Sequence, residues 1–153
     1  MKIAIDPGSR ATGVVAFVGG GAVSTTFYPR HKIKGFWAKT EDMVDRLFIW
    51  LEDLEKKHKQ VITTIAVEEF IKHVPRMIAS RLKRLFEFLG YLKGRLRGFC
   101  DSRGADLVDV CKGRAPKEEA LLVARAHGFE GRTQHEIDAF HLGLLAGFYC
   151  KLS

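Results

Sequence analysis

The chain has 153 residues, of which 46% are hydrophobic and 28% charged, and its formal net charge is +7. These values predict a single globular domain over residues 1–153 with an ordinary hydrophobic core. No apolar run approaches the roughly 20 residues of a membrane-spanning helix, so we expect no membrane association. The positive charge favours a polyanionic partner, and nucleic acid is the commonest one.

Three cysteines, Cys100, Cys111 and Cys150, are odd in number and widely spaced. Their spacing indicates neither a disulfide framework nor a zinc site. The N-terminus also lacks the pattern of a signal peptide, because only three apolar residues separate Lys2 from Asp6. We therefore expect the protein in a reducing compartment, the cytoplasm.

The N-terminal residues 3–13 read IAIDPGSRATG. Here a short apolar strand ends at Asp6, a Pro-Gly pair turns the chain, and a second strand follows over residues 14–18. A glycine turn and a third strand over residues 22–28 complete an antiparallel meander. Asp6 lies where a buried strand opens into a turn, a costly place for a carboxylate without a cation or donors. The alternative is that Asp6 caps the turn over Gly8 and Ser9.

Residues 29–39 form a basic, aromatic segment that we expect to be a loop. It is either a solvated connection with its aromatic side chains on the core, which we favour, or a flap that contacts DNA. Its basic and aromatic residues are Arg30, His31, Lys32, Lys34, Phe36 and Trp37. Thr40 is expected to cap the following helix, whose apolar residues recur at helical spacing through Leu54.

The most strand-like run, over residues 61–67, ends on Glu68 and Glu69. Helical segments before and after this run predict parallel pairing within the sheet. Ligands of such sheets bind at the carboxyl ends of the strands, where buried acidic side chains require partners. Glu68 is therefore a stronger candidate site residue than Asp6.

A long helix is predicted from Val74 to Cys100, with apolar residues at heptad-like spacing. Gly90 and Gly94 lie on a neighbouring stripe, and glycine in a helix interior costs about 1 kcal/mol relative to alanine. Close approach of another helix or of the sheet would compensate for that cost. The helix therefore contacts a second subunit or lies in the core of a monomer, and its basic side chains form a phosphate-attracting side.

The C-terminal part is predicted to contain a strand over residues 106–110, a basic loop, a helix through His127 and a final helix. Thr133 and Glu136 match a capping box, which explains Glu136 as a cap. His135 and Asp138 are three residues apart and share a helix face. His141 is expected to be a core or surface histidine. Carboxylates of Asp6, Glu68 and Asp138 converging on one rim would repel one another unless a cation lay between them.

The motifs IDPGSRATG at residues 5–13, AVE at 66–68 and HEIDA at 135–139 resemble those of the RuvC-type Holliday junction resolvases. The resemblance covers essentially the whole chain and implies an α/β, RNase H-like fold. This fold has a five-stranded mixed sheet, three antiparallel strands and then parallel strands, with helices on both faces. The resemblance also implies a homodimer through the Val74–Cys100 helix that nicks four-way junctions in paired strands and leaves 5′-phosphate ends.

The active-site set implied by the resemblance is Asp6, Glu68, His135 and Asp138. Such carboxylates suit Mg²⁺ or Mn²⁺, and two ions would stabilise the attacking and leaving oxygens of a phosphodiester. His135 would either bind an ion or orient the attacking water, and we favour the second role. The expected DNA contacts are Arg10, Arg76, Lys83, Arg84, Lys112, Arg114 and Lys117, and which of the last three contacts the scissile phosphate stays open.

Three other functions remain as alternatives. A nuclease of the same fold could process flaps or RNA instead of junctions. The hairpin at Asp6 is also similar to the phosphate loop of actin-like ATPases, although those proteins use two duplicated lobes. Finally, a non-catalytic junction-binding protein would keep the basic helix but would have no reason to place acidic residues at strand ends.

Overall fold

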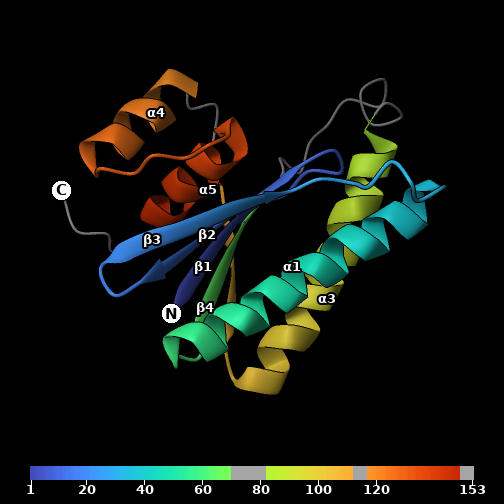
Figure 1. The fold of residues 1–153 in the computed structure, drawn as a ribbon, viewed down its shortest axis with the longest axis horizontal. Helices are drawn as coiled ribbons and strands as arrows, with labels where there is room; N and C mark the ends of the chain where they lie inside the picture. Colours follow the sequence, from blue (N-terminus) through green and yellow to red (C-terminus); the bar gives the residue numbers. More distant parts are fainter. Residues whose placement is uncertain (70–81, 112–116, 149–153) are drawn as a thin grey trace.

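The computed structural model of the protein describes residues 1–69, 82–111 and 117–148. In this part of the chain, five strands form one sheet in the order β3-β2-β1-β4-β5. Helices α1 and α3 cover one face of the sheet, and α5, with α4 beside it, covers the other (Figure 1). The strands are β1 (Lys2–Asp6), β2 (Thr12–Val18), β3 (Gly21–Phe27), β4 (Thr64–Glu68) and β5 (Asp106–Val110), and the helices are α1 (Phe36–His58), α3 (Lys83–Arg103), α4 (Lys117–Ala126) and α5 (Gln134–Leu145).

The predicted fold class is confirmed. Strand β2 pairs antiparallel with both β1 and β3, whereas β4 pairs parallel with both β1 and β5. The β2–β3 connection turns through Gly19 and Gly20, whose φ angles are 61° and 80°. Positive φ at both positions matches the twist of a tight antiparallel hairpin and is readily adopted by glycine.

Two hydrophobic cores hold the helices on the sheet. The larger core lies under α1 and α3 and is built around Met43, Leu47, Leu51, Phe88, Leu92 and Leu96. The smaller core lies under α5, where the ring of Phe140 stacks on Phe129 and Phe17 at centroid distances of 4.3 and 5.4 Å. Gly143 lets α5 approach the sheet closely, because a Cβ there would collide with the Phe17 ring.

The predicted loop over residues 29–39 is wrong at its end, because α1 begins at Phe36 and Thr40 is not its cap. Thr40 is buried inside the helix, and the Lys39 amide already donates to the Gly35 carbonyl at 3.2 Å. Gly35 precedes the helix with φ 89°, a conformation that glycine adopts without strain. Helix α1 therefore begins about one turn before the position that Thr40 as a cap would give it.

The predicted long helix is observed as α3, and its segment over residues 74–81 lies outside the described residues. The helix continues past Cys100 to Arg103 and ends at Gly104, whose φ is 64°. A Cβ at Gly90 or Gly94 would meet no described atom within 4 Å, so the predicted close approach of the protein's own sheet at these glycines is wrong. This stripe of α3 is an open surface of the described chain.

The cysteines behave as small hydrophobic or surface residues. Cys100 and Cys111 are free, Cys100 is buried and Cys111 is exposed, while Cys150 lies outside the described residues. Burial raises the pKa of the Cys100 thiol, which keeps this group neutral and unreactive. None of the described helices combines the length and apolar character that a membrane span requires.

Leu51→Ala tests the larger core. Leu51 is 0% exposed, so its truncation should lower the free energy of unfolding by about 2–5 kcal/mol. Leu122, which is 65% exposed on α4, is the matched control, and Leu122→Ala should change that free energy by no more than about 0.5 kcal/mol. Urea denaturation measures both, and equal effects would contradict the described packing.

Candidate active site

Asp6 is the last residue of β1 and lies at the start of a firmly held turn. The Thr12 hydroxyl donates to the Gly8 carbonyl at 2.9 Å and accepts from the Gly8 amide at 3.3 Å. The turn therefore takes side-chain hydrogen bonds from Thr12. Asp6 is itself 9% exposed, so its carboxylate requires polar partners.

The strand register aligns Asp6 with Glu68. Ile5 pairs with Val67 across the parallel β1–β4 pair, and both pack in the larger core under α1 and α3. Ala66 packs in the smaller core under α5. Because side chains alternate along a strand, Asp6 and Glu68 both face the α5 side at the carboxyl ends of neighbouring strands. This is the edge at which parallel sheets bind ligands.

The N-terminus of α5 lies directly on this edge. Thr133 caps the helix by accepting from the Glu136 amide, and its hydroxyl lies 2.7 Å from that of Thr26 on β3. Gly13, the partner of Asp6 in the β1–β2 pair, lies under the first turn of α5. A Cβ on Gly13 would collide with the backbone of His135, so a larger residue would push the helix away from the sheet.

This docking brings His135 to Asp6. The imidazole Nδ1 of His135 donates to the Asp6 carboxylate, with 3.3 Å between Nδ1 and Oδ2. The side chain of His135 is 43% exposed, whereas that of Asp6 is 12% exposed. The largely buried carboxylate of Asp6 therefore holds the more exposed imidazole of His135 in one orientation. Because Nδ1 faces Asp6, Nε2 is the ring nitrogen that could orient a water molecule.

The structure also places three other residues named in the sequence analysis, two acidic residues and one histidine, all on α5. Glu136 is confirmed as a cap, since it is 2% exposed and its carboxylate accepts from the Arg132 and Thr133 amides. Asp138 accepts from the Gln134 side-chain amide at 3.0 Å. His141 is confirmed as a buried residue.

The carboxylates at this edge offer hard oxygens, the ligand type that Mg²⁺ and Mn²⁺ bind, whereas the imidazole of His135 is a ligand of softer metals. Asp6 and Glu68 each follow the last register pair of β1 and β4, Ile5 and Val67, and His135 contacts Asp6, so the carboxylates suit a divalent ion in their chemistry. No three such side chains are already gathered as a ligand group among the residues that the structure describes.

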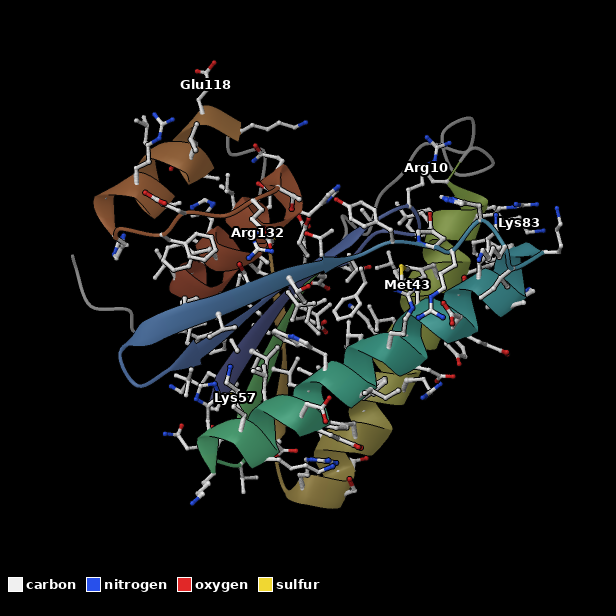
Figure 2. The ribbon with its side chains drawn as sticks, viewed as in Figure 1. Arg10, Met43, Lys57, Lys83, Glu118 and Arg132 are labelled. Carbon is white, nitrogen blue, oxygen red and sulfur yellow. The ribbon has the colours of Figure 1, made fainter. Side chains whose placement is uncertain are left out.

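A basic groove begins beside His135. It has a volume of about 920 Å³ and is bounded by the β1–β2 turn and the N-terminal ends of α1 and α3. Its basic side chains are Arg10, Lys39, Lys83 and Arg84. Arg10 and Lys83 lie at the same end of the molecule, although they are more than 70 residues apart in the chain (Figure 2). The fold therefore places a positively charged surface next to the Asp6–His135 pair, which suits a phosphate backbone.

Arg10, Lys83 and Arg84 are thus the expected DNA contacts that the structure brings together at the groove. Lys117 is exposed at the start of α4 and does not line the groove. Arg76, Lys112 and Arg114 lie outside the described residues. Farther along α3, Lys93 and Arg95 form ion pairs with Asp109 and Asp45 at 2.7 and 2.9 Å, so their charges are partly neutralised within the domain.

Sequence reasoning missed three residues that build this site. Gly13 admits α5, Thr26 anchors its cap, and Lys39 lines the groove. Glycine inside a strand often marks a close backbone approach, which was an available signal for Gly13. Lys39 falls in the predicted loop because the predicted cap, Thr40, lies five residues after the observed cap, Gly35. Thr26 depends on a contact between residues 107 positions apart in the sequence.

Comparison with solved structures shows the same fold in RuvC proteins. The chain is 20% identical to Thermus thermophilus RuvC in complex with a Holliday junction substrate, covering 97% of this chain and 92% of that one, with a TM-score of 0.64. A second Thermus thermophilus RuvC structure is 21% identical and is covered to 93%, also with a TM-score of 0.64. No protein-family model and no curated protein matches the sequence. The chain therefore has the RNase H-like fold of the RuvC structures over nearly its full length.

Gly13→Ala tests the docking of α5. The added methyl group would meet the His135 backbone, and we expect a loss of about 1–3 kcal/mol in the free energy of unfolding. The control is Gly21→Ala at the start of β3, where the nearest atom to a new Cβ, the Val18 carbonyl oxygen, is 3.8 Å away. Thermal denaturation compares the two variants. A Gly13→Ala protein as stable as the control would contradict the close contact of α5 with β2.

Proposed function

We propose that this protein is a metal-dependent endonuclease that resolves four-way DNA junctions. The observation that carries the proposal is the position of Asp6, Glu68 and His135 at one sheet edge beside a basic groove. The RuvC structures of the same fold include one bound to a Holliday junction substrate, which supports the choice of branched DNA.

The residues proposed to hold the divalent ions are Asp6, Glu68 and Asp138. When bound, such ions stabilise the charge that grows on the attacking and leaving oxygens of a phosphodiester. His135 is proposed to orient the attacking water through Nε2, while Asp6 holds the ring through Nδ1. Arg10, Lys83 and Arg84 would bind the phosphates on either side of the cleaved bond.

Paired cleavage requires two active sites related by symmetry, so we propose that the protein acts as a homodimer. The open stripe of Gly90, Gly94 and Gly98 on α3 supports this arrangement, because small residues allow close approach of a second helix. Two such sites would nick opposing strands of a junction and leave 5′-phosphate ends that a ligase can join. Mg²⁺ or Mn²⁺ would serve as the cofactor.

Asp6→Asn tests the assignment of the active site. The substitution preserves size but removes a hard anionic ligand, so cleavage of a synthetic four-way junction should fall by at least about 100-fold. Junction binding, measured by electrophoretic mobility shift, should persist because the groove is unchanged. Asp53→Asn is the control, since Asp53 is exposed on α1. Undiminished cleavage by the Asp6 variant would refute the site.

Lys83→Gln tests the groove as the DNA-binding surface. Removal of one phosphate contact should weaken junction binding and reduce the slope of log affinity against log salt by about 1. Lys57 offers a matched control, because it is an exposed lysine in the last turn of α1, whereas the groove lies at the start of that helix (Figure 2). Fluorescence anisotropy at several salt concentrations measures both variants. Equal losses for Lys57→Gln and Lys83→Gln would show that binding follows net charge and not this groove.

A further inference from the structure

An aromatic patch lies at the start of α1, in which Trp37 is exposed and the other two rings are partly buried against the larger core. It consists of Phe36, Trp37 and Tyr91, with centroid distances of 5.2 Å between the first two rings and 6.2 Å between the last two. Trp37 is 49% exposed, although tryptophan is on average a highly buried residue. The described residues therefore leave about half of its surface open.

Arginine side chains surround this patch. The guanidinium of Arg84 lies 5.3 Å from the centroid of Phe36, and that of Arg95 lies 5.6 Å from the centroid of Tyr91. These contacts hold the rings in place by cation–π attraction, and Arg84 gives the patch a positive side, whereas Arg95 is paired with Asp45. An anionic ligand with flat aromatic groups is complementary to both features, whereas an apolar protein segment matches only the rings.

The patch is continuous with the basic groove. Phe36 and Arg84 both line the groove that leads from His135, and Lys39 follows one turn after Phe36 on α1. A nucleic acid strand whose phosphates lie along these cations would bring its bases toward the aromatic rings. This combination of a basic track and exposed aromatic side chains is typical of proteins that bind single strands.

We propose that Trp37, supported by Phe36 and Tyr91, stacks on an unpaired base of the DNA substrate. The inference rests on the proposed function and deepens it, because a strand that is opened at a branch point exposes such bases. The patch supplies affinity for unpaired DNA of any sequence, since every base has an aromatic face. Trp37 is thus a binding residue separate from the acidic side chains at the sheet edge.

The chain offers a direct optical test. It has two tryptophans, Trp37 and Trp50, and Trp50 is partly buried against the core, where its ring contacts Phe27. In a Trp50→Phe protein, Trp37 is the sole tryptophan. Titration with a short oligothymidylate in the presence of chelator should quench its fluorescence saturably, whereas the Trp37→Phe protein should show little quenching. Unchanged fluorescence of Trp37 while a labelled oligothymidylate binds, or absence of binding altogether, would overturn the proposal.

Affinity measurements provide a second test. Trp37→Ala should weaken oligothymidylate binding by about 5- to 150-fold, and Trp37→Phe should retain most of the affinity. Ile49→Ala is the control, because Ile49 is 58% exposed on the same helix and should leave affinity unchanged. Urea denaturation of each variant shows that folding is intact. Equal affinities for Trp37→Ala and the wild type would overturn the proposal.

The two proposals fail in different ways. Base stacking is measured on single strands without metal and does not depend on Asp6. If Trp37 fluorescence is not quenched but cleavage still depends on Asp6, only the stacking role is overturned. Saturable quenching with cleavage that survives Asp6→Asn would overturn the nuclease site and leave the binding patch standing.

Discussion

The close packing of the α5 N-terminus on Gly13 is the constraint on which the site depends. Asp6 and Gly13 are paired across two strands, and the first turn of α5 occupies the space that a side chain at Gly13 would fill. His135 consequently reaches Asp6, while Thr133 and Glu136 satisfy the backbone of the same turn. His135 thus reaches Asp6 because Gly13 has no side chain and because α5 begins with a well-formed cap.

Charge is divided between two neighbouring surfaces. Acidic side chains occupy the carboxyl ends of β1 and β4, and basic side chains line the groove formed by the β1–β2 turn and the starts of α1 and α3. A phosphodiester bound along the cations would meet the Asp6–His135 pair at the end of the groove. In the proposed nuclease, this separation would let binding energy position the substrate while the acidic edge carries out the chemistry. The proposal would also explain why a basic protein keeps acidic side chains at its sheet edge.

Much of the fold could be predicted because strand pattern and turn chemistry are local signals. The order of the strands along the chain, the Gly19–Gly20 hairpin and the capping box at Thr133 all follow from short segments. The start of α1 could not, since Gly35 begins the helix before its apolar stripe does. Gathering Arg10 and Lys83 into one groove depends on the packing of α1 and α3 against the sheet, which no local pattern encodes.

Cleavage of a synthetic immobile four-way junction, beside linear, flap and RNA controls, tests the central claim most directly. Each substrate is incubated with Mg²⁺, with Mn²⁺ and with chelator, and the products are mapped at nucleotide resolution. The account predicts paired, symmetric nicks in the junction with either ion, little cleavage of the controls and none with chelator. An intact junction in both ions, or cleavage that persists in chelator, would contradict it.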